Sequence, residues 1–235
     1  MNEAAVEVAG VWKFFGDYPA LREIELRIPA GSCVALIGRN GAGKTTLLRI
    51  LGGLSRAAKG AVTVGGIDPR EPGARRRIGF IGHGISVYDE LSAIENLHLF
   101  ARLYGLPDPS QAAGQWIERV GLTRVKDGLV REFSRGMRQR LAVARAFVHD
   151  PSVLLLDEPF TSLDDRAIAL LQKLIHQARA DGRSVIMSTH QLREALELAS
   201  HVALLERGRL LYYGVRTAEM AADPGYLYRK YGERE

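Results

Sequence analysis

The stretch GRNGAGKTT, residues 38–46, decides the fold expected of this 235-residue chain. Its spacing is G-x-x-x-x-G-K-[ST], and it lies between the apolar run SCVALIG (32–38) and the helical pattern KTTLLRILGGL (44–54). The glycines let backbone N–H groups curl around a phosphate, Lys44 brings a positive charge to it, and Thr45 offers a hydroxyl to Mg²⁺. A chance glycine-rich turn is disfavoured, because the spacing and the flanking elements agree independently. The stretch predicts a phosphate loop between a buried strand and a helix.

Acidic residues follow a second apolar run, VLLLDEP (153–159). In open α/β sheets, ligands bind at the carboxyl ends of the strands, which is where these carboxylates should lie. Asp157 is placed to hold Mg²⁺, and Glu158 to polarise a water that attacks a phosphoanhydride. Carboxylates that merely cap the following turn are the structural alternative. His190 follows the strand pattern VIMST (185–189) and could contact a γ-phosphate, although a lone histidine at a strand end is more often structural.

Strand and helix patterns alternate along most of the chain, which predicts an α/β protein with a mostly parallel sheet. Two strand patterns, AVEVAGVW and LREIELRI, open the chain, and a strand pair is expected around AVTVGG and RIGFIG. Near the end, HVALLERGRLLYYG predicts a hairpin that turns at Arg207-Gly208. Residues 84–149 interrupt this alternation with a helical pattern.

Three helices are expected in the 84–149 segment. Ser92 and Glu95 form a capping-box pattern, and Ser110 is the expected cap of the second helix. The third helix follows Ser134 and carries Leu141, Ala144 and Val148 on one face. Ser134 and Gly136 stand at its start among basic residues, in REFSRGMRQR (131–140). A helix start offers unpaired N–H groups and a positive dipole end, so this is a second candidate anion site.

Composition places the chain among soluble globular proteins, with 46% hydrophobic and 25% charged residues and a net charge of +5. The single cysteine, Cys33, excludes an internal disulfide and is expected in the core. No run of 18 apolar residues is present, so we expect no membrane span. Basic residues interleaved with aromatics occur only in YLYRKYGERE (226–235), so we expect no nucleic-acid partner.

Four segments together resemble the ATP-binding subunits of ABC transporters across essentially the whole chain. In order they are GRNGAGKTT, SRGMRQRLAVARA, LLLDEPFTSLD and STH. The resemblance implies a P-loop NTPase fold with a RecA-like core, an N-terminal antiparallel β subdomain and an inserted α-helical subdomain. It implies one domain, 1–235, with the core at 1–83 and 150–235 and the helical subdomain at about 84–149. It also implies an ATPase that uses ATP and Mg²⁺ and drives transport.

The resemblance assigns roles to individual residues. Those expected to bind ATP are Phe15 against the adenine and the loop residues Gly38, Arg39, Asn40, Gly41, Ala42, Gly43, Lys44, Thr45 and Thr46. Those expected to bind the ATP of a partner subunit are Ser134, Arg135, Gly136, Met137 and Asp164. The expected metal ligands are Thr45, Asp157 and His83, and the expected catalytic residues are Glu158, His190 and His83. Phe15 as a plain core residue is the alternative, because Trp12 and Phe14 are also aromatic.

Two positions depart from the family pattern. Met137 stands where the signature segment, here residues 134–140, usually has Gln, so a polar contact to the nucleotide is lost. His83 stands where the family usually places a Gln that contacts Mg²⁺ and the water, and its charge depends on pH near neutrality.

The resemblance also implies partners. Two subunits, expected as a homodimer, pair head to tail so that the signature segment of one faces the ATP of the other. Integral membrane permease subunits should dock in a groove around residues 84–100 and hold the chain peripherally at the cytoplasmic face of the membrane. Tyr88, Leu91 and Leu97 are the candidate contacts, although single residues of these types more often belong to a core.

FIGH (80–83), ELSAIENL (90–97) and the lack of a regulatory extension resemble the haem-exporter ATPase of cytochrome c maturation. Exporters of drugs, lipids or polysaccharides share the SRGMRQR form and remain the alternative. A non-transport ABC ATPase is less favoured, because such proteins usually carry two domains or a long coiled-coil insertion. A phosphate-loop kinase does not explain Ser134, and a dinucleotide-binding Rossmann domain does not explain Lys44-Thr45.

Overall fold

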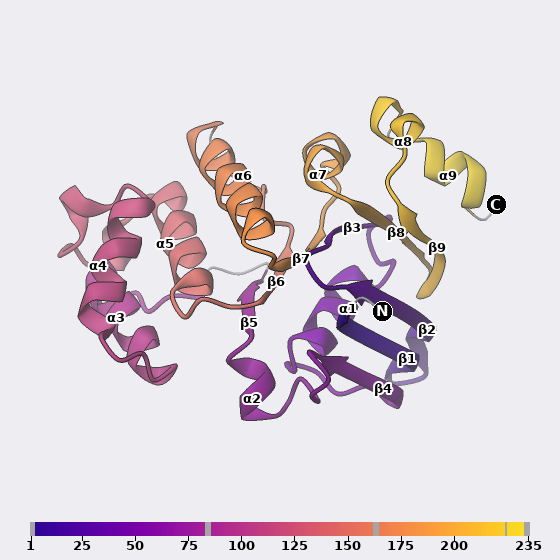
Figure 1. The fold of residues 1–235 in the computed structure, drawn as a ribbon, viewed down its shortest axis with the longest axis horizontal. Helices are drawn as coiled ribbons and strands as arrows, with labels where there is room; N and C mark the ends of the chain where they lie inside the picture. Colours follow the sequence, from indigo (N-terminus) through magenta and orange to yellow (C-terminus); the bar gives the residue numbers. More distant parts are fainter. Residues whose placement is uncertain (1–2, 83–85, 162–164, 224, 233–235) are drawn as a thin grey trace.

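The computed structural model of the chain describes residues 3–82, 86–161, 165–223 and 225–232, and its described strands form two sheets (Figure 1). The smaller is antiparallel, with the order β2(Tyr18–Pro29), β1(Ala4–Phe15), β4(Lys59–Val64). The larger has the order β5(Ile78–Ile81), β6(Val153–Asp157), β7(Ser184–Ser188), β3(Cys33–Ile37), β8(His201–Glu206), β9(Arg209–Val215). Its strands are parallel except β9, which pairs antiparallel with β8. The predicted α/β class, with a mostly parallel sheet and a separate antiparallel one, is confirmed.

The helices flank this sheet and also build a separate bundle. They are α1(Lys44–Leu51), α2(Pro72–Arg75), α3(Ala93–Leu103), α4(Pro109–Arg119), α5(Arg135–Phe147), α6(Asp165–Ala180), α7(Leu192–Leu198), α8(Ala218–Ala222) and α9(Tyr226–Tyr231) in the described residues. α1 lies between the two sheets, whereas α6 and α7 cover the other face of the larger sheet (Figure 1). α3, α4 and α5 pack on one another at one end of the molecule. Within the part of the chain described, no helix has the length and apolarity needed to cross a bilayer.

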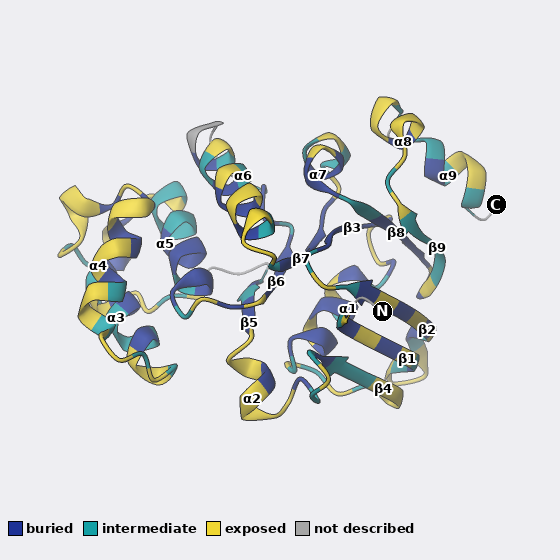
Figure 2. Ribbon diagram, viewed as in Figure 1, coloured by how far each residue is buried: buried dark blue, intermediate teal, exposed yellow. Residues whose placement is uncertain are grey.

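The central strands are buried on both faces, which explains their unbroken apolar runs. Every residue of β3 is buried (Figure 2). Cys33, Ala35 and Ile37 face the core under α3 to α7, and Val34 and Leu36 face the core around α1. Burial raises the pKa of the Cys33 thiol to about 12, so this cysteine is an inert core residue.

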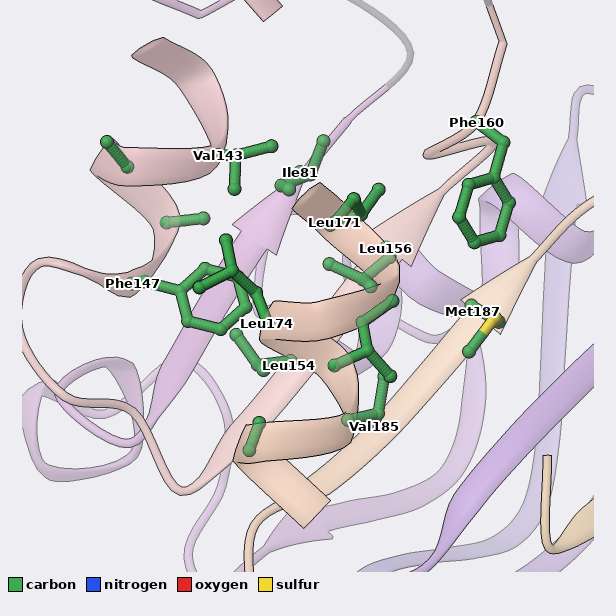
Figure 3. Packing of buried hydrophobic residues seen from close by; sticks show 14 of the residues in the cluster. Ile81, Val143, Phe147, Leu154, Leu156, Phe160, Leu171, Leu174, Val185 and Met187 are labelled. Atoms are coloured by element: carbon green, nitrogen blue, oxygen red, sulfur yellow. The ribbon is translucent and has the colours of Figure 1, made fainter. Parts of the chain in front are cut away.

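α6 packs its apolar face across β6 and β7 and reaches α5. In this cluster Leu171 and Leu174 of α6 lie over Leu154 of β6 and Val185 of β7, next to Phe147 of α5 (Figure 3). The contact joins the helical bundle to the sheet that carries the acidic strand end. It therefore fixes the position of α5 relative to β6.

The helical bundle confirms one predicted cap and corrects another. The Ser92 hydroxyl accepts a hydrogen bond from the Glu95 N–H, and the Glu95 carboxylate accepts one from the Ser92 N–H, so the capping box is present. The second helix begins earlier than predicted, because Asp108 caps it and Pro109 supplies a preset first turn. Ser110, the expected cap, lies inside the helix.

Two further expectations are wrong. The strand patterns at AVTVGG and RIGFIG do not pair with each other, because β4 joins β1 while β5 pairs with β6 at the edge of the parallel sheet. Leu97 is fully buried inside the helical bundle, so it cannot contact a partner protein. The hairpin that turns at Arg207-Gly208 is confirmed as β8–β9.

His149 connects the end of α5 to the edge of the sheet. Its Nε2 lies 3.0 Å from the carbonyl oxygen of Ile78, and its ring stacks on Tyr104 with 3.6 Å between ring centroids. Its Nδ1 is buried without a hydrogen-bond partner among the described residues. Burial lowers the pKa of His149 to about 4, and the hydrogen bond to the Ile78 carbonyl opposes this shift only in part. The imidazole is therefore neutral at pH 7 and donates its Nε2 hydrogen.

Acid should weaken this contact. Between pH 6.5 and 4 the unfolded chain binds a proton at His149 that the folded chain excludes, so the free energy of unfolding falls as pH falls, by up to roughly 3 kcal/mol. His149→Gln keeps an N–H donor but does not titrate. Urea unfolding at pH 7, 5.5 and 4.5 should show a steeper loss of stability in the wild type than in the variant. Parallel curves for the two proteins would contradict this role of His149.

Candidate functional site

The phosphate loop has the backbone geometry that its sequence predicts. It joins the end of β3 to α1, and Gly43, the residue before the helix, has φ +107°. This angle strongly favours glycine. Among the residues that the structure describes, no side chain caps α1, so the N–H groups of its first turn remain available to an anion.

Lys44 lies across the loop and is buried. Its Nζ donates to the carbonyl oxygens of Gly38 at 2.7 Å and Arg39 at 3.3 Å. Burial lowers the pKa of Lys44, and the negative charges of Glu158 and Asp157 oppose that shift. The ammonium group thus depends on nearby negative charge, which a phosphate would supply.

Asp157 of β6 is hydrogen-bonded to residues of two other elements, α1 and β7. Its Oδ1 accepts hydrogen bonds from Thr45 Oγ1 of α1 at 3.0 Å and from Ser188 Oγ of β7 at 2.5 Å. The carboxylate is buried at the carboxyl end of β6. Thr45 and Asp157 therefore present adjacent oxygen atoms, as predicted from two motifs more than a hundred residues apart.

Glu158 and His190 form a second pair beside the first. His190 Nδ1 lies 2.8 Å from Glu158 Oε2, and the backbone N–H of His190 donates to the same oxygen at 3.2 Å. The side chain of Glu158 is 13% exposed and that of His190 59% exposed. Glu158 has φ +52°, a strained angle for a residue with a side chain, and its N–H donates to the Ser188 carbonyl at 3.0 Å.

Lys44, Thr45, Glu158 and His190 line one cavity of about 790 Å³. Its wall is made by the loop residues from Asn40 to Thr46 together with Phe15, Tyr18, Ala20, Arg49, Glu158, Thr161 and His190. Phe15 is 59% exposed, so the alternative that made it a core residue is wrong. The buried hydroxyl of Thr161 has no hydrogen-bond partner in the described part of the chain.

The signature segment lies elsewhere. Ser134 caps α5 by accepting from the Met137 N–H at 3.3 Å, and Ser134 and Arg135 are exposed. No residue of α5 lines the cavity beside Lys44, and α5 lies beside α3 and α4 rather than beside α1 (Figure 1). His83 and Asp164 are outside the residues that the structure describes.

The family model described as "ABC transporter" matches residues 21–161, which include the phosphate loop, the signature segment and the acidic strand end. The chain belongs to the ABC transporter family. Its phosphate loop, Asp157 and Glu158 are therefore parts of an ABC domain that binds and hydrolyses ATP.

Relatives in this family include exporter subunits. The chain is 36% identical to the Nod factor export ATP-binding protein I of Cupriavidus metallidurans, over 90% of this chain and 71% of that protein. It is 35% identical to the ABC transporter ATP-binding protein NatA of Bacillus subtilis, over 89% of each chain. It is 37% identical to the daunorubicin resistance ATP-binding protein DrrA3 of Streptomyces coeruleorubidus, over 96% of this chain and 72% of that protein.

Solved ABC structures share the fold. An ATP-binding subunit of an ABC transporter matches with a TM-score of 0.85 and 28% identity, over 97% of this chain and 93% of that one. The dimeric post-hydrolysis state of an ATP-binding cassette bound to ADP and Pi matches with a TM-score of 0.81 and 26% identity, over 91% and 99% of the two chains.

The oxygen atoms of this ABC domain suit Mg²⁺. Thr45 Oγ1 and Asp157 Oδ1 are 3.0 Å apart, and Mg²⁺ is typically bound by one or two such protein oxygens together with phosphate and water. In the described residues no three His, Cys, Asp or Glu side chains cluster to form a metal cage of their own. The residues thus fit a metal ion that arrives with a nucleotide.

Sequence reasoning missed Ser188 beside this cavity and four residues of its wall, Tyr18, Ala20, Arg49 and Thr161. Ser188 bonds to Asp157, Tyr18 faces Phe15 across the β1–β2 turn, and Thr161 follows the acidic strand end. A serine at the carboxyl end of a strand beside β6 was a signal for the first. Tyr18 could be found only from the strand register, which places it opposite Phe15.

Ser188 should matter for metal use. Ser188→Ala removes a donor from a buried carboxylate, so we expect a loss of about 1–3 kcal/mol in the free energy of unfolding. We also expect the Mg²⁺ concentration at half-maximal ATPase activity to rise several-fold, because Asp157 is held less firmly. The matched control is Ser184→Ala at the other end of β7, where the hydroxyl accepts from the Gly31 N–H at 3.0 Å. The same Mg²⁺ dependence in both variants would refute this role.

Proposed function

We propose that this chain is the ATP-hydrolysing subunit of an ABC exporter and works as a pair of identical subunits under a membrane permease. The observation that carries the proposal is the division of its site. Lys44, Glu158 and His190 line one cavity, and Asp157 is hydrogen-bonded to Thr45 in its wall, whereas the exposed start of α5 with Ser134 lies outside it. Such a half-site is completed when a second subunit brings its own α5 to the cavity.

Hydrolysis follows from the positions of the residues in the cavity. The N–H groups at the start of α1 and the ammonium of Lys44 bind the β- and γ-phosphates of ATP. Thr45 and Asp157 would hold Mg²⁺, which when bound would neutralise phosphate charge. Glu158 Oε2 accepts a proton from a water whose oxygen attacks the γ-phosphorus, the bond to the bridging oxygen breaks, and ADP leaves. His190 holds the Glu158 carboxylate through the 2.8 Å contact.

The second subunit contributes the start of α5. Its exposed Ser134 and Arg135, with the half-buried Gly136 and Met137, would face the γ-phosphate held by the first subunit, and N–H groups at a helix start suit that anion. The apolar Met137 leaves the backbone and Ser134 to make the contact. Asp164 and His83 keep their predicted places at the dimer seam and beside the metal, as proposals from sequence alone.

Phe15 and Tyr18 would hold the base. They are cross-strand partners at the β1–β2 turn, both 59% exposed, and both line the cavity. Partners in register point to the same side of a sheet, so the two rings form one apolar surface. A purine can cover more of that surface than a pyrimidine can.

Export of a compound other than haem is the better-supported direction. Relatives at 36–37% identity are named for Nod factor export and daunorubicin resistance. No relative named above is a haem exporter, so the FIGH and ELSAIENL resemblance does not carry a haem cargo. The proposal therefore commits to an exporter and leaves haem aside.

A groove between the sheet and the helical bundle is the proposed contact for the permease. A cavity of about 270 Å³ there is lined by Leu54 and Phe80 on one side and by Phe100 and Tyr104 on the other. Tyr88 is 52% exposed and stacks on Phe100 of this lining, with ring centroids 6.0 Å apart. Apolar and aromatic groups at this junction suit a short segment of a membrane protein, which would hold the chain at the cytoplasmic face.

A mixing experiment tests the shared site. Ser134→Arg and Lys44→Ala each damage both sites of a homodimer, but their heterodimer contains one intact site. Equal mixing of the two inactive proteins should restore about a quarter of wild-type ATPase activity, if the subunits exchange freely. The assay is phosphate release with Mg-ATP, in the presence of the permease where the free subunits do not pair.

The control mixture is Lys44→Ala with Glu158→Gln. Both residues belong to the same half-site, so no heterodimer of these two variants has an intact site, and activity should stay absent. Recovery in neither mixture would argue against shared sites. Recovery of ATPase activity in both mixtures would show that the activity does not come from complementation between the two half-sites.

Base recognition gives a second test. Phe15→Ala and Tyr18→Ala should each weaken ATP binding by roughly tenfold, because stacking on a ring contributes on the order of 1–3 kcal/mol per base. Both should reduce the preference for ATP over CTP and leave inorganic tripolyphosphate binding unchanged. Phe14→Ala is the matched control, since Phe14 stacks on Trp12 and does not line the cavity. Calorimetry that finds Tyr18→Ala equal to Phe14→Ala would remove Tyr18 from the base site.

A further inference from the structure

The turn between β8 and β9 contacts the phosphate loop on the side away from the cavity. The Gly208 N–H donates to the carbonyl oxygen of Ala42 at 3.0 Å, and the Gly208 carbonyl accepts from the Arg22 N–H of β2 at 2.7 Å. The N–H and the C=O of Gly208 thus join the phosphate loop to β2. None of the sequence motifs includes Gly208.

The approach between these segments is too close for a side chain. A Cβ at Gly208 would lie 2.8 Å from the Ala20 carbonyl oxygen, and a Cβ at Gly43 of the loop would lie 2.8 Å from the same oxygen. A Cβ at Gly38 would lie 2.2 Å from the Leu205 carbonyl oxygen of β8. Backbone atoms of β2 and β8 therefore enclose the rear of the phosphate loop.

The hydrogen bond from Gly208 has a directional consequence. In a planar trans peptide the C=O and the next N–H point in opposite directions. Because the Ala42 carbonyl is held toward Gly208, the N–H of Gly43 points the other way, toward the cavity that Gly43 lines. An N–H aimed into that cavity is a phosphate donor.

We propose that Gly208 is a positioning residue of the nucleotide site, which sets the Ala42–Gly43 peptide so that the Gly43 N–H meets a phosphate. This inference rests on the proposed function for the identity of the ligand. It adds a residue about 165 positions from the loop to the binding machinery. The role requires a glycine for its backbone approach as well as for its φ of +79°.

The test compares two glycines with the same backbone angle. Gly208→Ala introduces a Cβ that collides with backbone, so the turn must move away from β2 and from Ala42. Gly182→Ala is the matched control, because Gly182 also has φ +79° but a Cβ there meets nothing within 4 Å. Both variants carry the strain of a positive φ, and only Gly208→Ala disturbs the loop.

The expected result is a roughly tenfold loss of affinity for both ATP and inorganic tripolyphosphate in Gly208→Ala, measured by calorimetry well below the melting temperature. Gly182→Ala should bind both ligands as the wild type does. Equal affinities in the two variants would overturn the proposal. Failure of the wild type to bind ATP at all would instead refute the proposed function.

A measurement on the wild type keeps the inference testable if Gly208→Ala does not fold. Amide hydrogen exchange should show the Gly208 N–H protected, and saturating tripolyphosphate should slow its exchange further, because a bound phosphate fixes the peptide that carries its acceptor. Slower exchange within residues 38–46 alone, with Gly208 unchanged, would overturn the coupling.

Discussion

The site depends on one carboxylate oxygen, Oδ1 of Asp157, to which Thr45 of α1 and Ser188 of β7 both donate. This oxygen fixes the phosphate loop against the acidic strand end. It lies at the carboxyl edge of the parallel sheet, where strands far apart in sequence finish side by side. Because β3, β6 and β7 are neighbours in that sheet, the turns that follow them bring Lys44, Glu158 and His190 to one cavity. The chemistry is therefore a consequence of strand order, and the antiparallel sheet contributes its outer wall through Phe15 and Tyr18.

The charged groups in and beside this cavity explain why it suits a nucleotide. Lys44 is buried and its pKa is lowered by desolvation, while Asp157 and Glu158 lie close enough to oppose the shift. A polyphosphate with Mg²⁺ brings both signs of charge into this space, so each buried group gains a partner. The strain at Glu158, with its φ of +52°, is maintained by the bond from its N–H to Ser188. Binding and catalytic groups thus share the same supports in β7.

The sequence predicted the fold class and most of the candidate site because those features are local. A phosphate loop needs its glycines, Lys44 and Thr45 in one short stretch, and a buried parallel strand shows as an unbroken apolar run such as SCVALIG. The errors lie where the answer depends on distant contacts. AVTVGG and RIGFIG look alike as strands, but only the tertiary structure assigns β4 and β5 to different sheets. Leu91 and Leu97 are the same residue type, so the sequence alone does not distinguish them. The packing of α3 on α4 and α5 is what buries Leu97.

The two anion-binding features of the chain differ in what they lack. The first has Lys44, the oxygen pair of Thr45 and Asp157 and the carboxylate of Glu158, and its cavity is open toward solvent at Phe15, Tyr18 and His190. The second, the start of α5, has an exposed Ser134, and no residue of α5 lines that cavity. In the proposed dimer, one γ-phosphate lies between two copies of the chain and contacts both surfaces. Its loss on hydrolysis would remove that shared contact, so the free energy that joins the copies would be coupled to the bond that Glu158 is proposed to help break.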